Sequence, residues 1–363
     1  MKIGIVGLGL IGGSLAQAST AAGHEVFGTD QNVAFVKKAI SNNAIQGEST
    51  ISDMADVCDV LVLCVPSRTA TSLVEEALEG NAIVTDVASV KQPICDAVSK
   101  LDSEKQDRFI GGHPMAGSEQ SGYDAARANL FQNKMWIVVP PKNNSLKHVA
   151  TIESFVTSLG AEHCVLSPEQ HDKLVANISH LPQLASSTLM TIAADQAVDN
   201  EIILRLAGGG FRDMTRIAAS NATMWTDIVH DNAQEISSAL ESYIDALKKL
   251  KNDVDTFEES KIKDLFNRAR SARSSLPSAV RRLEHLTEIL VPVPDEPGVL
   301  ASITGLTNDI NVYDIKIVHA LEEDRGVLSL VVKPEVADGL IDTLIEHGFE
   351  ATRSELESSE VEE

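Results

Sequence analysis

The first half of the chain alternates short apolar runs with stretches of helical periodicity. Two near-continuous apolar runs, at 59–65 and 82–87, predict strands of a parallel sheet that are buried on both faces. Further strands are expected at 2–6, 25–29, 109–112, 135–139 and 162–166, with helices between them at 10–22, 33–40, 72–78 and 146–159. This alternation predicts an α/β fold, with a Rossmann-type doubly wound sheet over residues 1–166.

The strand pattern stops at Ser167, and residues 167–283 have helical periodicity only. Ser167 is expected to cap a helix that carries Pro168 in its first turn. That helical pattern continues to Leu189, and more helical segments are expected at 199–206, 212–219, 224–250 and 263–273. Because a helical block of this kind has no sheet of its own to pack on, we expect an all-helical dimerisation domain and a homodimer.

The pattern changes again near residue 286. Strands are expected at 290–293, 311–319, 327–332 and 349–353, with helices at 299–307 and 336–347. This βαββαβ order predicts a small ferredoxin-like domain over residues 286–355. The remaining residues, 356–363, are an acidic tail that we expect to be disordered.

Charge and composition limit which partners, location and metal sites are expected for this chain. The net charge of −23 argues against a nucleic acid or an anionic membrane as partner, so an anionic substrate must be held by locally placed arginines. The chain enters its first strand directly and has no membrane-spanning apolar run, so neither a signal peptide nor a membrane is expected, and the location should be cytoplasmic. Cys58, Cys64, Cys95 and Cys164 have no C-x-x-C spacing, which predicts free thiols and no metal site.

A glycine-rich turn follows the first predicted strand. Gly7, Gly9 and Gly12 form G-x-G-x-x-G between this strand and a helix, the context that indicates dinucleotide binding. Asp30 ends the second strand, where its carboxylate can accept hydrogen bonds from ribose hydroxyls and would repel a 2′-phosphate, so we predict NAD rather than NADP. The other expected cofactor-binding residues are Leu10, Ile11, Val65 and Pro66.

Two polar segments follow predicted strands of the same sheet. The first, 86–91 (DVASVK), contains Ser89, and the second, 111–119 (GGHPMAGSE), contains His113 and Glu119. Ligands of doubly wound sheets bind beyond the carboxyl ends of the strands, where both segments are expected to lie. This position favours a catalytic role for His113 over that of a loop histidine without function.

The helical block contributes two further motifs. His180 precedes a proline in SHLP (179–182), and GGGFRDMTR (208–216) interrupts the helical pattern with three glycines. Each glycine costs a helix about 1 kcal/mol relative to alanine, so three of them suggest close backbone approach to another element or to a ligand. Arg212 or Arg216 can bind a carboxylate bidentately; the alternative is a surface ion pair with Asp213.

Five motifs in this order resemble the prephenate dehydrogenases and their arogenate-using relatives: GLGLIGGS, DVASVK, GGHPMAGSE, SHLP and GGGFRDMTRIA, within residues 1–275. The resemblance implies hydride transfer from C4 of prephenate to NAD while the ring carboxylate leaves as carbon dioxide, which yields 4-hydroxyphenylpyruvate. It implies that His113 takes the proton of the C4 hydroxyl and that Ser89 assists there.

The same resemblance implies the substrate contacts. Arg216 matches the arginine that holds the side-chain carboxylate, with Asp213 orienting it. Glu119 matches an acid near the site entrance, and His180 matches a histidine of the substrate pocket. Many relatives read SHLPH where this chain has Gln183, so prephenate and arogenate both remain open as substrates.

The segment DEPGVL (295–300) resembles an ACT domain, a small regulatory fold that binds amino acids. The resemblance implies tyrosine as a feedback effector, bound by Asp295, Gly298, Val299 and Leu300; the alternative is a domain kept for assembly. Two other functions stay open. One is a β-hydroxyacid dehydrogenase, which shares the glycine motif and the helical block but is expected to use a catalytic lysine. The other is an amino-acid sensor that binds NAD without turnover.

Overall fold

The chain forms two compact units, Met1–Phe257 and Glu258–Glu363, each of which is considered by itself. The computed structural model describes residues 1–117, 120–141, 144–199, 202–275, 286–294, 296, 298–307, 310–319 and 325–354. Glu119, Asp295 and the predicted acidic tail at 356–363 lie outside these residues.

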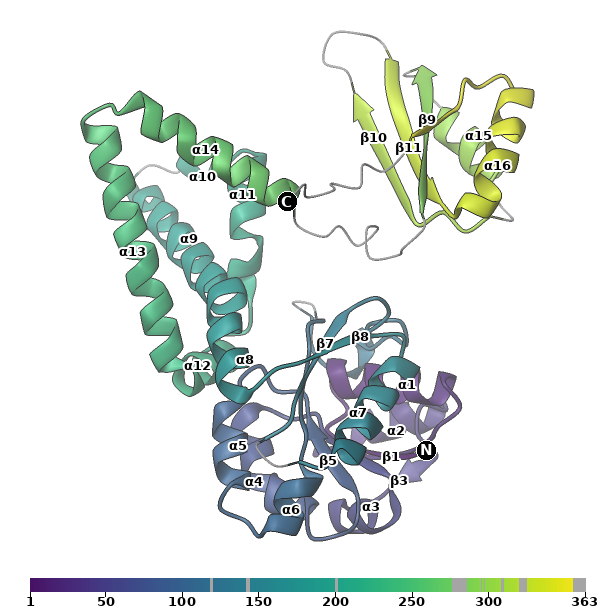
Figure 1. The fold of residues 1–363 in the computed structure, drawn as a ribbon, viewed down its shortest axis with the longest axis vertical. Helices are drawn as coiled ribbons and strands as arrows, with labels where there is room; N and C mark the ends of the chain where they lie inside the picture. Colours follow the sequence, from purple (N-terminus) through teal and green to yellow (C-terminus); the bar gives the residue numbers. More distant parts are fainter. Residues whose placement is uncertain are drawn as a thin grey trace. The chain divides into compact units, whose positions relative to one another are not determined.

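The first unit is built on a five-stranded parallel sheet with strand order β3-β2-β1-β4-β5 (Figure 1). Its strands are β1 (Lys2–Val6), β2 (Glu25–Thr29), β3 (Gly47–Glu48), β4 (Val60–Leu63) and β5 (Ile83–Asp86). The helices between them are α1 (Leu10–Ala21), α2 (Val33–Ser41), α3 (Ile51–Val57), α4 (Ser67–Ala77), α5 (Gln92–Val98) and α6 (Ser103–Arg108).

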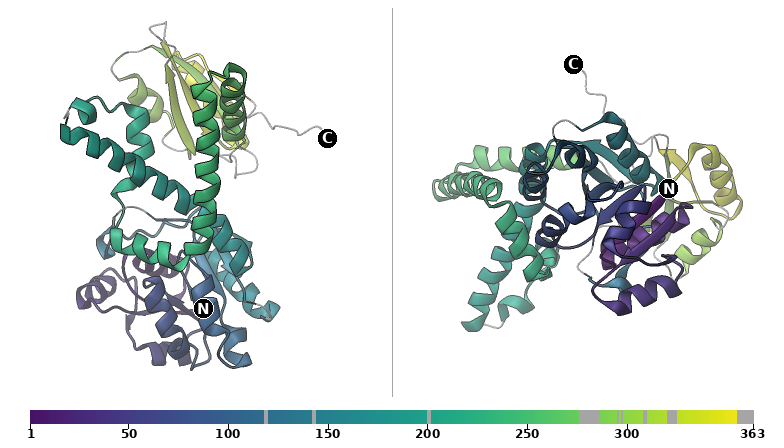
Figure 2. Two further views of the ribbon diagram at one scale, coloured as in Figure 1. Left: turned by 90° about the vertical axis from the view of Figure 1, so that its left-hand side faces the viewer. Right: turned by 90° about the horizontal axis from the view of Figure 1, so that it is seen from below.

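Strand β4 is buried on both faces of the sheet, which explains why its run of apolar residues is unbroken. Val60 and Val62 pack into the core on one face of the sheet, whereas Leu61 and Leu63 pack into the core on the other. Helices cover both faces (Figure 2), so every side chain of β4 is buried, and each contributes about 1.5–3 kcal/mol of hydrophobic stabilisation. The predicted doubly wound sheet is therefore confirmed, although β3, α3, α5 and α6 had no clear sequence pattern.

A second sheet of three strands extends this unit. It contains β6 (Gly111–Pro114) antiparallel to β7 (Met135–Val139), which is parallel to β8 (Glu162–Val165). Phe109 bridges to Val84 of β5, so the predicted strand at 109–112 was placed two residues too early. Consequently His113 lies within a strand rather than in a loop after one, and its backbone position is set by pairing with β7.

The helical part of the first unit begins as the sequence predicts. The Ser167 hydroxyl accepts a hydrogen bond from the Gln170 backbone N–H, and the Gln170 side-chain oxygen accepts one from the Ser167 backbone N–H, so the cap is reciprocal. Helix α7 (Leu146–Ser158) precedes this part and connects β7 to β8. The helices here are α8 (Pro168–Val175), a π-helical segment (Ala176–His180), α9 (Leu181–Asp199), α10 (Ile202–Arg205), α11 (Gly209–Thr215), α12 (Ala222–Asp231) and α13 (Ala233–Asp255). Short 3₁₀ turns occur at Tyr123–Ala125 and at Arg216–Ala219, the latter labelled η3.

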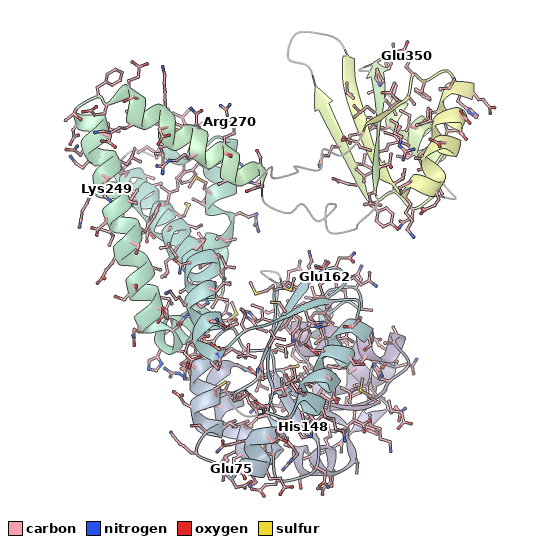
Figure 3. The ribbon with its side chains drawn as sticks, in the orientation of Figure 1. Glu75, His148, Glu162, Lys249, Arg270 and Glu350 are labelled. Carbon is pink, nitrogen blue, oxygen red and sulfur yellow. The ribbon has the colours of Figure 1, made fainter. Side chains whose placement is uncertain are left out.

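Two predicted helices differ in extent from those observed. In the segment expected at 199–206, α9 ends at 199 and α10 covers Ile202–Arg205, while residues 200 and 201 lie outside the described residues. The long helix expected at 224–250 is two helices, because Asn232 leaves helical geometry between α12 and α13 and its side chain bonds to other elements. Outside its first turns α13 is largely exposed, as the projecting side chains around Lys249 show (Figure 3).

The second unit contains α14 (Glu259–Ser274) and a four-stranded antiparallel sheet with strand order β10-β11-β9-β12. Its other elements are β9 (Thr287–Pro294), α15 (Val299–Gly305), β10 (Asp314–His319), β11 (Arg325–Val332), α16 (Pro334–Glu346) and β12 (Thr352–Ser354). Alternate residues of β9, such as Ile289 and Val291, form a core with Ile303 of α15 and Leu340 of α16. The predicted βαββαβ order is confirmed.

All four cysteines are free, as predicted: Cys58 and Cys95 are buried and Cys64 and Cys164 are half-buried. Burial raises the pKa of Cys58 to about 11 and that of Cys95 to about 12, so these thiols stay protonated near neutral pH. In the described part of the chain, no three acidic, cysteine or histidine side chains are grouped to hold a metal ion. Within the same residues, no helix combines the length and the apolar character needed to cross a bilayer.

Candidate active site

The glycine-rich turn between β1 and α1 has the geometry that each glycine position requires. Gly7 has a φ of +94°, and a Cβ there would lie 2.4 Å from the Cys64 carbonyl oxygen. A Cβ on Gly12 would lie 1.8 Å from the Gly7 carbonyl oxygen, so helix and strand pack too closely for any side chain. By contrast, no described atom lies within 4 Å of a Cβ on Gly9, which leaves its backbone open to a phosphate group.

Asp30 lies beside this turn, where two backbone hydrogen bonds fix its carboxylate. One carboxylate oxygen accepts a hydrogen bond from the Leu8 backbone N–H at 2.6 Å, and the other accepts from the Asn32 N–H at 2.7 Å. Each oxygen retains a lone pair for a ribose hydroxyl. Two further residues predicted to contact the cofactor follow β4: Val65 lies against Gly7, and Pro66 precedes α4. The predicted Leu10 and Ile11 form the first turn of α1.

A buried ion pair joins the two polar segments that were expected at the sheet edge. The Lys91 ammonium contacts the Asp86 carboxylate, and neither side chain is exposed to solvent. Lys91 Nζ also donates to the Gly112 carbonyl oxygen at 2.8 Å, while Asp86 accepts from the Gly112 N–H at 3.2 Å. These bonds tie the DVASVK segment, with the half-buried Ser89, to the strand that carries His113.

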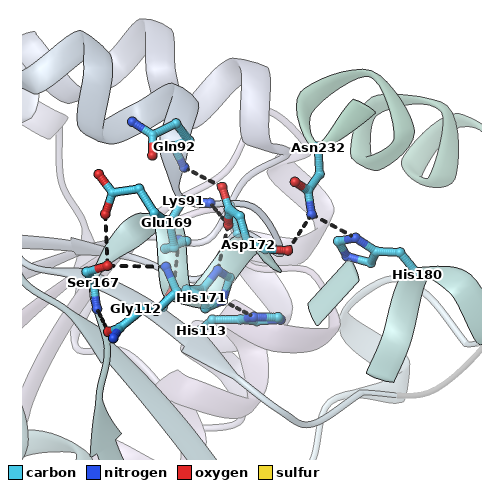
Figure 4. A network of polar contacts seen from close by, with 12 residues as sticks. Lys91, Gln92, Gly112, His113, Ser167, Glu169, His171, Asp172, His180 and Asn232 are labelled. Atoms are coloured by element: carbon cyan, nitrogen blue, oxygen red, sulfur yellow. Dashed lines mark hydrogen bonds and ion pairs between the residues drawn. The ribbon is translucent and has the colours of Figure 1, made fainter. Parts of the chain in front are cut away.

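His113 lies in a chain of hydrogen bonds that reaches into α8 (Figure 4). Its Nδ1 is 2.8 Å from His171 Nε2, and His171 Nδ1 is 2.6 Å from an Asp172 carboxylate oxygen. The Asp172 carboxylate also accepts from the backbone N–H groups of Lys91 and Gln92, each at 2.8 Å. The site is therefore assembled from β6, the start of α5 and α8.

His171 and Asp172 were not among the site residues predicted from the sequence. A signal was present, since the buried positions of α8 are 168, 171, 172 and 175, the spacing of one helix face. Polar residues at two of these four positions break the expected apolar face. Buried polar groups need partners, so such a break points to a hydrogen-bonded network.

His180 is buried at the end of the π-helical segment. Its Nδ1 is 3.2 Å from Asn232 Nδ2, and the same Asn232 amide donates to the Asp172 backbone carbonyl at 2.8 Å. His180 Nε2 is buried without a hydrogen-bond partner among the described residues, and the ring meets Trp225 edge-on. An unpartnered polar atom at a π-helical segment is typical of a functional site.

Burial sets the protonation of the three histidines. It is the first cause that lowers the pKa of His113 well below 6.5, followed by the charges on His171, Lys91 and His180. Burial also lowers the pKa of His171, although Asp172 opposes that effect, and it lowers the pKa of His180 to about 4. All three rings are therefore neutral near pH 7, the state in which an imidazole can accept a proton.

The segment that carries Arg216 is attached to the start of α9 by Gln183. The Gln183 side-chain amide is 6% exposed and donates to the Ile217 carbonyl oxygen at 2.8 Å. Arg216 itself is exposed at the start of η3. Gln183 directly follows SHLP in the first turn of α9. Its hydrogen bond to Ile217 therefore links the segment that carries the predicted His180 to the segment that carries the predicted Arg216.

The glycine-rich motif of α11 does not approach another element of the described chain, because no described atom lies within 4 Å of a Cβ built on Gly208, Gly209 or Gly210. Approach to a ligand, the other possibility that the three glycines suggest, stays a prediction. The alternative of a surface ion pair is not found between these described residues, since the exposed Asp213 pairs with neither Arg212 nor Arg216. Arg212 Nε instead donates to the Ala207 carbonyl oxygen at 3.1 Å.

Known protein families match two adjacent segments of this chain. The family described as "Prephenate dehydrogenase, nucleotide-binding domain" matches residues 15–165, and "Prephenate dehydrogenase, dimerization domain" matches residues 167–268. Prephenate dehydrogenase of Bacillus subtilis (strain 168) is 31% identical over 338 residues, which cover 90% of this chain and 90% of that protein.

Solved structures show the same similarity. Prephenate dehydrogenase from A. aeolicus, in complex with hydroxyphenyl propionate and NAD+, matches with a TM-score of 0.70 and 29% identity and covers 76% of this chain and 98% of its own. Synechocystis arogenate dehydrogenase matches with a TM-score of 0.66 and 30% identity and covers 76% of this chain and 100% of its own. The chain is thus similar to proteins named for either of the two substrates.

Proposed function

Because this chain belongs to the prephenate dehydrogenase family, we propose that it catalyses the NAD-dependent oxidative decarboxylation of prephenate to 4-hydroxyphenylpyruvate. One observation carries the proposal: a buried, neutral His113 lies on β6, which is tied through Gly112 to the end of β5 of the dinucleotide-type sheet, and it is in hydrogen-bond contact with a second histidine. Bound NAD would supply the acceptor for the hydride that leaves C4. The ring carboxylate leaves as carbon dioxide, and its electron pair completes the aromatic ring.

The dinucleotide is proposed to lie along the turn of Gly7, Gly9 and Gly12. The open backbone at Gly9 and the N-terminus of α1 suit the pyrophosphate, and Asp30 suits the two ribose hydroxyls. A 2′-phosphate next to the Asp30 carboxylate would be repelled, so NAD is preferred over NADP. Leu10, Ile11, Val65 and Pro66 complete the proposed cofactor contacts.

His113 is proposed as the general base. It accepts the C4 hydroxyl proton as the hydride departs, and its depressed pKa keeps it neutral and ready at neutral pH. Ser89, on the segment tied to β6 through Lys91, is proposed to hydrogen-bond the same hydroxyl.

Substrate contacts are proposed for three described residues and one outside them. Arg216 would hold the side-chain carboxylate, and the unpartnered Nε2 of His180 would face the substrate. Asp213, which pairs with neither neighbouring arginine in the isolated chain, and Glu119, outside the described residues, are proposed as further contacts.

Arogenate is the second candidate substrate, and one observation favours keeping it. Gln183 takes the place of a histidine found in many relatives, and its amide is already committed to the Ile217 carbonyl. The pocket therefore lacks one imidazole that would meet the keto side chain of prephenate. Oxidation of arogenate at the same site would yield tyrosine directly.

The small βαββαβ unit is proposed to be an ACT domain that binds tyrosine as a feedback effector. Gly298 has a φ of +95° at the start of α15, and it is followed by Val299 and the exposed Leu300. These residues, together with Asp295, are the proposed effector contacts. A backbone turn of this kind offers N–H groups to a carboxylate.

A homodimer is proposed through the helical part of the first unit. Tyr243, Ile244 and Leu247 are each at least 40% exposed and share one face of α13. An exposed apolar stripe of this kind indicates a protein interface. The molar mass of the purified protein in solution tests this directly, and a monomer at micromolar concentration would contradict it.

The reaction is tested by the absorbance of reduced nicotinamide with purified protein, NAD and either prephenate or arogenate, each with and without tyrosine. We expect turnover with one substrate, loss of turnover in His113→Asn, and lower activity with tyrosine. His163→Asn, a histidine on β8, is the matched control that should keep activity. Silence with both substrates would overturn the proposal in favour of a β-hydroxyacid dehydrogenase or of a sensor that binds NAD without turnover.

A further inference from the structure

The hydrogen bonds around His113 have a definite direction. Asp172 is placed so that its two carboxylate oxygens accept from the backbone N–H groups of Lys91 and Gln92 at the start of α5. Three donors, counting His171 Nδ1, meet this one carboxyl group. Such an environment stabilises the carboxylate anion, which has lone pairs and no proton to donate.

The positions of the ring protons follow from this anion. Because the Asp172 carboxylate can only accept, the proton of neutral His171 must sit on Nδ1, and its Nε2 carries a lone pair. That lone pair is 2.8 Å from His113 Nδ1, which must therefore be the donor. The lone pair of neutral His113 is then left on Nε2, the ring nitrogen that takes no part in the bond to His171.

We propose that His171 and Asp172 are positioning residues that hold His113 in its Nδ1–H tautomer, so that Nε2 is the atom that accepts the substrate hydroxyl proton. This inference rests on the proposed function. When Nε2 takes the proton, the Nδ1–H bond to His171 is kept, and the negative Asp172 at the end of the chain stabilises the new imidazolium. No proton needs to leave His171 at any stage.

The other charged or titratable side chains that face this chain come from β5 with the segment after it and from the π-helical segment. Asp86 at the end of β5 neutralises the Lys91 ammonium on the segment that follows, and both side chains are fully buried. His180 approaches from the π-helical segment, and it is connected to Asp172 through Asn232. Asp172 is thus the nearest anion available to the His113–His171 pair, since Asp86 is already paired.

Asp172→Asn removes the negative charge and keeps the size of the side chain. Its NH2 group replaces one of the two oxygens: at one position it faces the Gln92 N–H and both rings keep their orientation, and at the other it faces the Lys91 N–H and donates to His171 Nδ1, which reverses both rings. Either arrangement removes the anion that stabilises the new imidazolium, so we expect kcat to fall on the order of 100- to 10,000-fold, while KM for substrate and for NAD changes little.

Asp107→Asn is the matched control. Asp107 likewise accepts a backbone N–H, from Ser145, and pairs with a histidine, His148 Nδ1 at 3.1 Å, but it belongs to α6 and bonds to the start of α7 rather than to the site. This variant should keep wild-type kcat. An equal loss of kcat in both aspartate variants would overturn the proposal, because it would show a general packing effect.

Nitrogen NMR of the imidazoles tests the tautomer without any turnover, so it stands even if the proposed reaction fails. In the substrate-free wild-type protein His113 should carry its proton on Nδ1. An Nε2–H tautomer of His113 in the wild-type protein would overturn the inference. Absence of turnover in the wild-type protein with the expected tautomer would instead count against the proposed function alone.

A second pair of variants tests the same inference independently of whether Asp172→Asn folds. His171→Gln retains an acceptor for the His113 Nδ1–H, whereas His171→Phe fills the space without one. We expect the glutamine variant to be at least about tenfold more active, and the acid limb of its kcat/KM profile to stay nearer that of wild type. Equal activity of the two variants would overturn the inference.

Discussion

Lys91 and Asp86 form an ion pair in which both side chains are 0% exposed, directly behind the strand that carries His113. The pair also binds the backbone of Gly112 on both its carbonyl and its N–H. A Cβ on Gly112 would lie 2.6 Å from the Asp86 carbonyl oxygen, so only glycine fits at this point. The position of His113 is thus set by a neighbour without a side chain and by a buried charge pair.

Removing one partner of this pair should destabilise the protein. Lys91→Met leaves the Asp86 carboxylate buried without its cation, which typically costs about 3–5 kcal/mol. We expect the denaturant midpoint of the first unit to fall accordingly. The double variant Lys91→Met with Asp86→Asn removes both charges and should recover a large part of the loss. A single variant within about 1 kcal/mol of wild type would contradict a buried pair.

Stability should depend on pH through the buried histidines. The pKa values of His113, His171 and His180 are all lowered, chiefly by burial, and that of His180 reaches about 4. Below pH 6.5 the unfolded chain binds protons at these rings that the folded chain does not, so the free energy of unfolding falls as pH falls from 6.5 towards 4. It should be independent of these groups above pH 7.

Urea unfolding at several pH values measures this slope. His180→Phe removes one of the three groups and should make the slope smaller between pH 6.5 and 4. An identical slope for wild type and His180→Phe would show that His180 is protonated in the folded protein.

Cofactor choice should depend on Asp30. Asp30→Asn removes the charge that repels a 2′-phosphate and weakens the bonds to the ribose hydroxyls, so the ratio of kcat/KM for NAD over NADP should fall about tenfold or more. Steady-state rates with each nucleotide give this ratio. Asp59→Asn is a matched control, because Asp59 also accepts a backbone N–H, from Lys2 at 2.7 Å, but precedes β4. An unchanged ratio in Asp30→Asn would remove Asp30 from the cofactor site.

Gln183 should affect substrate binding more than NAD binding. Gln183→Leu leaves the Ile217 carbonyl without its donor, at a cost of about 1–3 kcal/mol, and loosens the segment that begins with Arg216. We expect KM for the substrate to rise about 5- to 100-fold, with KM for NAD nearly constant. Thr191→Val, on the exposed side of the same helix, is the control. Equal increases in both KM values would point to a general distortion instead.

The glycines of α11 should show opposite effects on stability and on activity. Alanine at Gly210 meets open space in the isolated chain, so Gly210→Ala should stabilise the folded chain by about 0.5–1 kcal/mol. If the glycines admit a ligand, the same variant should lower kcat/KM. A variant that is more stable and fully active would show that neither ligand nor partner approaches there.

The sequence alone determined the elements whose residues interact locally. The glycine turn of β1 and α1, the Ser167 cap and the apolar run of β4 were predicted because their geometry depends on neighbouring residues and on burial of both sheet faces. The ferredoxin-like order of the second unit followed in the same way from its alternating strands.

Only the tertiary structure decided the composition of the site. His113 and His171 are 58 residues apart, and no periodicity indicates that β6 and α8 meet. Pairing of Phe109 with β5 shifted β6 by two residues and so moved His113 from an expected loop into a strand. Asn232 ends one helix because its amide bonds to Asp172 and His180, which are remote in sequence. Contacts of this kind depend on how strands and helices pack, and local sequence does not encode that packing in a form that can be read residue by residue.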